Sequence, residues 1–145
     1  MIEVGIARRD EWAAIRELII EGLAQRWGTY DASKNPDLDA FESTYAGQCV
    51  VAARSGNRVI GCGALVAVSK EAARIVRMSV SSAWQRQGIG RAMVRVLVNK
   101  ARESQFKEIH VETTTEWHSA VALYLAEGFV LTHSQDGDTH FTLRL

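Results

Sequence analysis

The sequence predicts one mixed α/β domain over residues 1–145, and three observations support this. Short alternating apolar segments typical of strands flank turn residues at 55–58 and 136–137 that favour hairpins. Apolar residues recur at helical spacing from Ile89 to Ala101, and a glycine-containing turn connects that helix to the strand before it. The chain is long enough to bury one core, and no repeat, linker or low-complexity segment divides it.

Composition and charge exclude several classes of protein. Hydrophobic residues make up 47% of the chain and the formal net charge is zero, so nothing indicates bulk attraction to nucleic acid or an anionic membrane. No apolar run approaches the roughly 18 residues that span a bilayer, and residues 1–10 lack the apolar core of a secretory signal. We therefore expect a cytoplasmic protein. Cys49 and Cys62 lack metal-ligand spacing, so we expect buried thiols and no metal site.

The N-terminal segment is predicted to form a strand and a helix. Ile2, Val4 and Ile6 alternate as residues of a strand do. Asp10 is in position to cap the helix that follows, which we expect to end near Gly22 or a few residues later.

A polar, aromatic loop is expected next, over residues 26–31. Asn35, Pro36 and Asp37 then combine a cap, a proline for the first turn and an acid for the positive end of the helix dipole. They predict a second helix that runs to about Tyr45.

The middle of the chain reads as three strands and a long helix. Strands are predicted at 49–53, 59–68 and 73–80, and in the last of these the apolar residues at 76, 78 and 80 would share one face. The helix has an apolar stripe, Ile89, Met93, Leu97 and Ala101. Its polar stripe is Arg91, Arg95 and Asn99.

The C-terminal part is predicted to contain a strand, a helix and a hairpin. The strand covers residues 106–113, and Glu112 shares one of its faces with His110. The helix covers residues 119–127 and is closed by a glycine suited to a left-handed cap. Two further strands, 129–133 and 139–145, would form the hairpin.

The turn between the 73–80 strand and the long helix, residues 85–90, is suited to anion binding. Gly88 and Gly90 let the backbone approach an anion closely, and the next helix points free N–H groups at the same spot. The turn does not match the dinucleotide-binding fingerprint, because Arg91 and Ala92 follow the second glycine. A Walker P-loop is also excluded, because no Gly-Lys-Ser/Thr is present.

With these motifs in order, the chain resembles the GCN5-related N-acetyltransferases (GNAT), which bind acetyl-coenzyme A. Their signature, Gln or Arg-x-x-Gly-x-Gly or Ala after the fourth strand, is similar to Gln85, Gly88 and Gly90. A second segment resembles the family's Ala-x-x-x-Tyr followed by Gly-Phe, with Tyr124 as its tyrosine. The resemblance implies a mostly antiparallel central sheet flanked by helices.

The resemblance also implies where acetyl-coenzyme A would bind. Backbone N–H groups from about Arg86 to Arg91 would hold the pyrophosphate, and a bulge at the end of the fourth strand would free an N–H at Met78 or Val80 for the thioester oxygen. The implied coenzyme-binding residues are Met78, Ser79, Val80, Gln85, Arg86, Gln87, Gly88, Ile89, Gly90 and Arg91.

Two residues depart from the family pattern. Arg86 stands where relatives often have glycine, and we expect it to keep a negative φ and use its charge on phosphate. Trp117 stands where many members have an asparagine that contacts coenzyme A. His118 is the alternative contact, and otherwise the contact is absent.

For the chemistry, Tyr124 resembles the family's general acid; the alternative is a half-buried helix tyrosine with no catalytic role. Glu112 is the candidate base or acceptor anchor, provided that it is buried near the acetyl group. The alternative is a structural ion pair, for example with Arg77. His110 and His118 are weaker candidates for the base.

The acceptor region is predicted at the loop between the first two helices. Its candidate substrate-binding residues are Trp27, Tyr30 and Asp31, together with Glu112 and the neighbouring Arg26. A surface loop anchored by its tryptophan is the alternative. We expect transfer of an acetyl group from acetyl-coenzyme A to a small-molecule primary amine by direct attack. A protein or peptide amine, or a non-catalytic acyl-coenzyme A sensor, is the alternative function; a homodimer is open by analogy alone.

Overall fold

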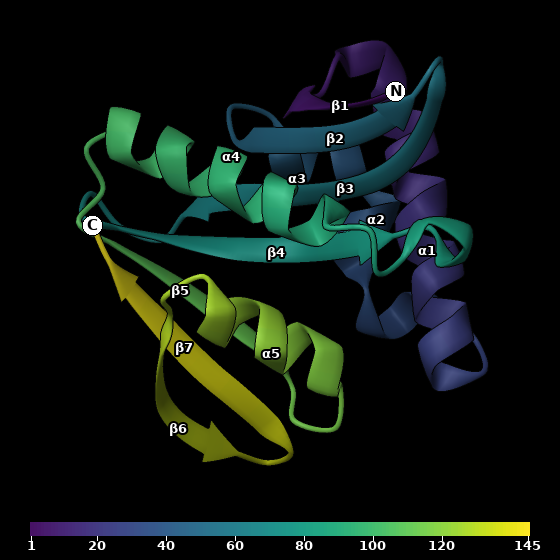
Figure 1. The fold of residues 1–145 in the computed structure, drawn as a ribbon. Helices are drawn as coiled ribbons and strands as arrows, with labels where there is room; N and C mark the ends of the chain where they lie inside the picture. The colour runs from purple at the N-terminus through teal and green to yellow at the C-terminus, as the bar shows by residue number, and fades with distance from the viewer.

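The computed structural model describes every residue from 1 to 145 and contains one seven-stranded sheet in the order β1-β2-β3-β4-β5-β7-β6 (Figure 1). Its strands are β1 (Ile2–Ile6), β2 (Cys49–Ser55), β3 (Arg58–Ala67), β4 (Ala72–Val80), β5 (Glu108–Thr114), β6 (Val130–Gln135) and β7 (Asp138–Arg144). Every neighbouring pair is antiparallel except β4 and β5, which run parallel. The predicted mixed, mostly antiparallel sheet is confirmed.

Five helices lie on the two faces of this sheet. They are α1 (Trp12–Trp27), α2 (Pro36–Asp39), α3 (Phe41–Tyr45), α4 (Ile89–Glu103) and α5 (His118–Ala126). Figure 1 shows α4 and α5 on the near face, with α4 over the first four strands and α5 over β5 and β7, while α1 to α3 lie behind. The fold is therefore three layers, with the sheet in the middle.

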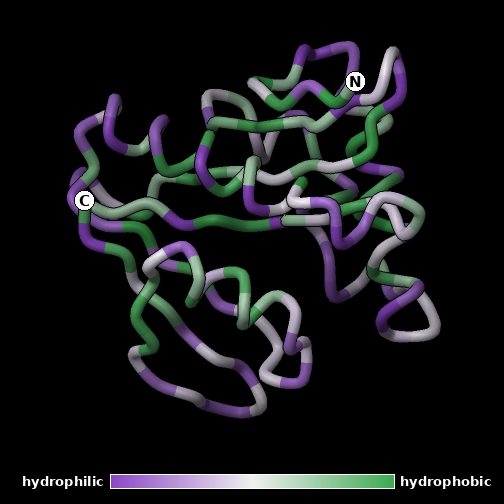
Figure 2. The backbone as a smooth tube through the Cα atoms, viewed as in Figure 1, coloured by the Kyte–Doolittle hydropathy of each residue, from purple (hydrophilic) through white to green (hydrophobic).

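Each face of the sheet buries its own apolar cluster. Val51 packs in the cluster beneath α4 and α5, whereas its neighbour Val50 packs in the cluster beneath α1 to α3. This alternation follows from the two-residue period of a strand. Figure 2 shows hydrophobic residues along the central strands, while the outermost strand, β6, is largely hydrophilic.

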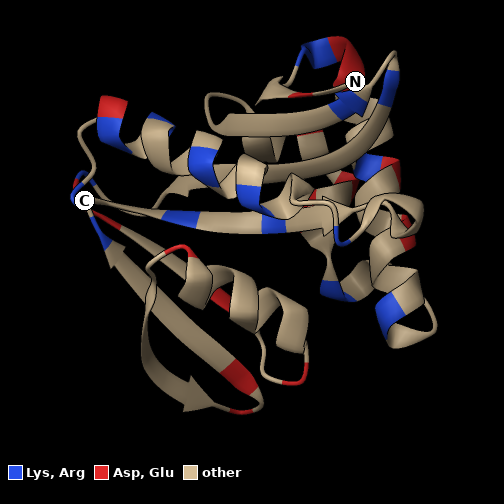
Figure 3. Cartoon of the chain, in the orientation of Figure 1, with Lys and Arg blue, Asp and Glu red and all other residues tan.

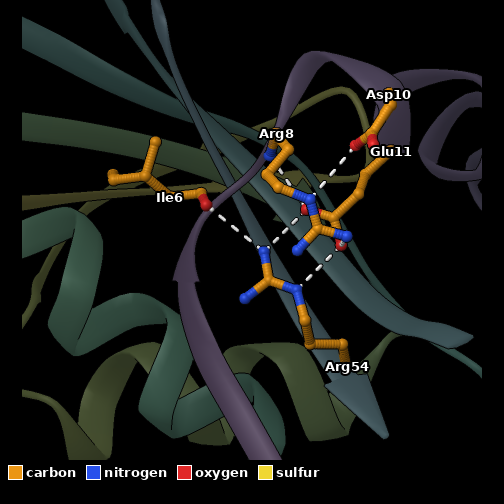
Figure 4. A network of polar contacts seen from close by, with 5 residues as sticks. All are labelled: Ile6, Arg8, Asp10, Glu11 and Arg54. Atoms are coloured by element: carbon orange, nitrogen blue, oxygen red, sulfur yellow. Dashed lines mark hydrogen bonds and ion pairs between the residues drawn. The ribbon is translucent and has the colours of Figure 1, made fainter. Parts of the chain in front are cut away.

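The start of α1 differs from the prediction, because Asp10 does not cap it. Residues Arg9–Glu11 form a 3-10 turn, and the Glu11 carboxylate accepts a hydrogen bond from the backbone N–H of Arg8 at 2.8 Å. The same carboxylate accepts two more from Arg54 of β2, at 2.7 and 2.8 Å (Figure 4). Glu11 rather than Asp10 accepts the backbone hydrogen bond at this turn, because Glu11 has a buried cationic partner, whereas Asp10 is exposed.

The end of α1 also lies beyond the predicted point. The helix passes through Gly22 and ends at Gly28, which has a φ of 78°. A Cβ at Gly22 would lie 2.8 Å from the Ser79 Oγ of β4, so this glycine permits close packing and does not terminate the helix. Arg26 and Trp27 consequently belong to the last helical turn rather than to a loop.

The predicted second helix is two short helices, α2 and α3, separated at Ala40. Pro36 begins α2 as expected. Asn35 does not cap it with its side chain, because its amide N–H donates to the Asp31 carbonyl at 2.8 Å and its oxygen accepts from Arg77 at 3.1 Å. Long-range contacts thus replace the local cap.

The rest of the chain follows the predicted pattern. The apolar stripe of α4 is buried and its polar stripe is exposed, which places the arginines of α4 on the outer surface (Figure 3). The last hairpin turns at Asp136 and Gly137, both with positive φ, as the tight turn between twisted strands requires. α5 ends before Gly128, whose φ is 92°.

Candidate functional site

A cleft opens where β4 and β5 separate. These parallel strands pair only from Ala72 to Arg74 and from Glu108 to His110, so the rest of β4 has no partner on that side. The cleft has a volume of about 800 Å³ and is lined by β4, the first turn of α4, the middle of α5 and the C-terminal half of α1. Figure 1 shows the strands spreading apart beside α5.

The unpaired part of β4 carries a bulge. Ala64 of β3 pairs with Val76 and Cys62 pairs with Ser79, so Gly63 alone faces the two residues Arg77 and Met78. Arg77 has a φ of 56°, in the left-handed region. An inserted residue of this kind re-aims the side chains that follow it.

The bulge corrects the prediction that the apolar residues at 76, 78 and 80 share a face. Val76 packs against the cluster under α1 to α3, whereas Met78 and Val80 pack against the cluster under α4 and α5. Strict alternation would have put Val76 and Met78 on the same side, and the extra residue shifts them to opposite sides.

The turn that leads into α4 is left open to solvent. Gly88 occupies the N-cap position with a φ of 80°, and no atom lies within 4 Å of the place where a Cβ would stand. No side chain caps α4, and its first turn has no acidic residue. The first N–H groups of this helix therefore point outward without a partner in the helix.

Other residues of the turn have different roles. Gln85 donates its amide N–H to the Val80 carbonyl at 3.2 Å, which ties the turn to the end of β4. At Gly90 a Cβ would lie 3.4 Å from Leu123 of α5, so this glycine allows α4 and α5 to pack closely. Gln87 lies outside the lining of the cleft, whereas the other predicted coenzyme-binding residues line it.

Arg86 adopts a conformation opposite to the one expected. Its φ is 63°, so the prediction of a negative φ is wrong. The physical reason is the tight return of the chain into α4, which passes through Arg86 and Gly88, both left-handed. For an arginine this conformation costs about 1–2 kcal/mol, a cost that a glycine would not carry.

Tyr124 stands at the wall of the cleft on α5. Its ring is 4% exposed and packs against Phe129 and Phe141, with centroids 5.6 and 5.9 Å away. Burial raises the pKa of its hydroxyl, and the charge of Arg26 opposes that effect only in part. The phenol therefore stays protonated at neutral pH and has a proton to donate.

Glu112 lines the cleft but is not buried as expected. Its side chain is 51% exposed, and its carboxylate pairs with His140 of β7 at 3.3 Å. The alternative pairing with Arg77 is also wrong, because Arg77 binds Asp37. β5 and β7 pair directly at Glu112 and His140.

The histidines named as weaker candidates lie away from the cleft. His110 pairs with Thr142 at 3.0 Å and with Glu108 at 3.3 Å. His118 is exposed at the start of α5. Neither residue is among those that line the cleft.

The predicted acceptor residues are not gathered at the cleft. Trp27 is 59% exposed, and Asp31 caps a short 3-10 turn by accepting from the Ser33 N–H at 3.0 Å. Tyr30 packs against the cluster under α1, and its buried hydroxyl has no hydrogen-bond partner. None of the three lines the cleft, although Arg26 does.

An aromatic and cationic cluster bridges the two sides of the cleft. The ring of Trp117, which lines the cleft, lies 5.4 Å from the ring of Trp27, and the guanidinium of Arg26 lies 4.1 Å from the Trp117 ring. This cation–π contact joins the end of α1 to the loop before α5. At the position of the family's asparagine, the chain thus has an aromatic bridge.

None of the five helices combines the length and apolar character that a membrane crossing needs. No group of three or more His, Cys, Asp or Glu side chains is arranged to hold a metal ion.

Comparison with known proteins identifies the family. The sequence profile of the acetyltransferase (GNAT) family matches residues 12–129. The chain belongs to the GNAT acetyltransferase family. The matched span runs from the start of α1 to Phe129, the residue before β6, so it includes both sides of the cleft and both motifs that carry the resemblance.

Curated relatives within GNAT are similar over part of their length. N-acetyltransferase 8F1 of Rattus norvegicus is 36% identical over 85 residues, which cover 55% of this chain and 38% of the relative. N-acetyltransferase 8F1 of Mus musculus is 34% identical over 122 residues, which cover 77% of this chain and 55% of the relative. The chain thus matches between about two fifths and half of these relatives.

Solved GNAT structures share the whole fold. An acetyltransferase of the GNAT family from Staphylococcus aureus Mu50 superposes with a TM-score of 0.86 at 16% identity, covering 100% of this chain and 99% of the other. A GNAT family acetyltransferase from Elizabethkingia anophelis, solved with acetyl-coenzyme A bound, has a TM-score of 0.77 at 18% identity, covering 99% and 98%. The seven-stranded sheet and its flanking helices are therefore those of the GNAT fold.

Sequence reasoning missed part of the cleft of this GNAT chain. Asp37, Tyr45 and Arg77 line it together. The first two were noted only as residues of a helix, and Arg77 as a possible ion-pair partner of Glu112. Tyr45 donates to the Asp37 carboxylate at 2.6 Å, and Arg77 binds the same carboxylate. The one available signal was an arginine at 77 between the apolar residues Val76 and Met78 of a strand, which calls for a buried or interfacial partner.

Proposed function

We propose that this chain is an acetyl-coenzyme A-dependent N-acetyltransferase that acts on a primary amine of a small molecule. The observation that carries the proposal is the meeting of an uncapped helix N-terminus, an unpaired strand edge and the Tyr124 hydroxyl in one cleft. These supply, in turn, anion binding, backbone hydrogen bonds and a proton.

The residues of the turn suit the pyrophosphate of the donor. The free N–H groups at the start of α4 and the open space at Gly88 favour an anion, and the first turn of α4 has no acidic residue. Arg86 and Arg91 add positive charge beside the same cleft. Arg91 is itself oriented by Glu127, whose carboxylate accepts from it at 2.7 Å.

The thioester would lie against the bulged end of β4. There the backbone N–H of Met78 or Val80 would donate to the carbonyl oxygen as it gains negative charge, because the strand has no partner on that side. Tyr124 would donate its proton to the departing thiolate. Burial raises the pKa of this phenol, which keeps it protonated but makes it a weaker acid, so the donation relies on its position in the cleft.

The acceptor amine would approach from the side of α1 to α3. Glu112 remains our candidate base or anchor on this side. Its pairing with His140 would let the carboxylate pass a proton on toward solvent. The volume of the cleft, about 800 Å³, lies in the range of small-molecule sites, roughly 300–1,000 Å³. Trp27, Tyr30 and Asp31 lie outside the cleft, so we propose for Trp27 only a supporting contact with Trp117.

The proposal is tested by thiol release from acetyl-coenzyme A across a panel of small amines, amino acids and short peptides. We expect turnover with some of the small amines. Tyr124→Phe should keep the ring packing and donor affinity but lower kcat about 100-fold, the lower range for a general acid. Tight donor binding without turnover on any amine would favour the acyl-coenzyme A sensor, and turnover restricted to peptides would favour the peptide alternative.

A further inference from the structure

Arg77 is strained in a way that no other strand residue shares. Four non-glycine residues of the chain have positive φ, and Arg77 is the only one of them inside a strand, since Arg86, Gln105 and Asp136 lie in turns. A left-handed arginine costs about 1–2 kcal/mol. Such strain persists only where surrounding contacts over-determine the conformation.

Those contacts come from the side chain of Arg77. Its Nε donates to Asp37 Oδ2 at 2.9 Å and its Nη2 to Asp37 Oδ1 at 2.5 Å, a two-pronged pairing of guanidinium and carboxylate. Nη2 also donates to the Asn35 side-chain oxygen at 3.1 Å. The Tyr45 hydroxyl donates to Asp37 Oδ2 at 2.6 Å, so α2, α3 and β4 meet at one carboxylate.

The arrangement is shielded from solvent and firmly ionised. The side chains of Arg77 and Asp37 are 21% and 20% exposed, and Tyr45 is 4% exposed. Burial opposes the charge on Asp37, but the hydrogen bonds from Arg77 and Tyr45 prevail and hold the pKa of this carboxyl below its usual range. Pairs of this kind are geometrically specific, and breaking one leaves an uncompensated charge.

The backbone of Arg77 is held from the other side as well. The Cys62 thiol lies 3.7 Å from its carbonyl, and Gly63 leaves the space that the Met78 side chain occupies. Arg77 precedes the N–H of Met78, so its φ and ψ determine where that N–H points. The side chain therefore fixes the direction of the Met78 N–H, one of the two backbone donors named in the proposed function.

We propose that Arg77, anchored by Asp37 and Tyr45, is a positioning residue that couples the acceptor-side helices α2 and α3 to the β4 backbone that binds the thioester oxygen. The proposal rests on the proposed function, and Arg77 acts through the backbone rather than on the substrate.

The test compares two truncations that remove the same contacts but differ in backbone preference. Arg77→Gly and Arg77→Ala both lose the Asp37 pairing, but only glycine adopts positive φ without strain. We expect Arg77→Gly to retain at least about fivefold more kcat than Arg77→Ala and to melt at a higher temperature. Arg74, also on β4 and in the cleft lining, has no positive φ, so at this control position glycine should melt no higher than alanine.

A second variant breaks the anchor and leaves Arg77 in place. Asp37→Asn should lower kcat at least tenfold with KM for acetyl-coenzyme A within about twofold, and calorimetry should show a reduced preference for acetyl-coenzyme A over coenzyme A. Equal kcat for the glycine and alanine variants of Arg77, or a loss confined to amine KM, would overturn the proposal. Failure of the wild type to bind or turn over the donor would instead refute the proposed function.

Discussion

Arg86 shows how a single residue balances stability against a charge at the cleft. Its left-handed φ of 63° is strained for an arginine, whereas a glycine would be free of strain. No protein group forms an ion pair with its guanidinium, which lines the cleft beside the N-terminus of α4. We infer that the charge is kept for an anionic ligand in spite of the strain.

Arg86→Gly should therefore stabilise the fold and lower the affinity for the acetyl donor. We expect the free energy of unfolding to rise by about 0.5–1 kcal/mol, since relief of the left-handed strain exceeds the added entropy of the unfolded chain. Acetyl-coenzyme A affinity should fall several-fold, with a weaker dependence on salt. Denaturant unfolding and calorimetry measure the two effects.

The matched control is Gln105→Gly, because Gln105 has a φ of 66° but lies in the turn after α4, away from the cleft lining. It should gain similar stability without any change in donor affinity. Unchanged donor affinity in Arg86→Gly would contradict a role for this charge.

Individual residues also mark where sequence reasoning ends. Tyr124 was predicted as the general acid from a local motif, and it lines the cleft; its catalytic role stays a prediction. Glu112 was expected to be buried and is half exposed, because its surroundings depend on whether any helix covers that face of β5 and β7. Strand alternation predicts which face of the sheet carries Glu112, but it does not predict whether another element packs over that face.

Among the secondary-structure elements, α4 carries the strongest functional signal. Its apolar stripe packs on the sheet, and its first turn is left without a capping side chain. Three features at this end favour an anion: the helix dipole, free N–H groups and the absence of acids.

Gly88→Asp tests this end of the helix, with Gly88→Ala as its control. Both variants force a side chain into a φ of 80°, so both should lose about 1–2 kcal/mol of stability. The added Cβ meets no atom within 4 Å, so neither variant creates a clash. Only the aspartate places a negative charge at the N-terminus, and we expect it alone to weaken acetyl-coenzyme A binding at least tenfold. Equal donor affinities for the two variants in a calorimetric titration would exclude the anion site.

Helix bounds were predicted well where the signal is local and poorly where packing overrides it. Pro36 marked the start of α2, and Gly128 marked the end of α5. The end of α1 was predicted near Gly22 or a few residues later, but Gly22 lies inside the helix, where Ser79 approaches it too closely for a Cβ. Whether a glycine ends a helix or makes room for a packing contact depends on a residue far away in the chain.

For the molecule as a whole, one buried ion pair fastens the N-terminal segment to the sheet. Glu11 binds Arg54 of β2 and the backbone of Arg8, and its side chain is 6% exposed (Figure 4). The hydrogen bond from Arg54 is the main reason why the pKa of Glu11 is lowered, and burial opposes it only in part. Protonation of Glu11 therefore opposes folding.

We expect this pair to appear in the pH dependence of global stability. A carboxyl whose folded pKa lies below its unfolded value of about 4.3 stabilises the fold fully above that value and loses the effect as pH falls through the folded pKa. Glu11→Gln should cost about 3 kcal/mol at neutral pH, and the difference from wild type should shrink below about pH 4.

Denaturant unfolding between neutral and acidic pH measures this difference. Glu17→Gln is the control, because Glu17 is exposed and paired only with Arg16 at the surface. A constant difference between wild type and Glu11→Gln at all pH values would show that the Glu11 charge does not contribute.

Local patterns were enough to predict the strands, the amphipathic α4 and the glycine turn, because those patterns express two-residue and 3.6-residue periods within a short stretch of chain. The same stretch carries the family signature, and most of the residues predicted to bind the coenzyme line the cleft, although their role stays a prediction. The contact on the acceptor side was not predicted: Asp37 and Arg77 are 40 positions apart, and a bulge in β4 turns Arg77 toward α2. Such a contact depends on how distant elements pack, and no local period in the sequence encodes it.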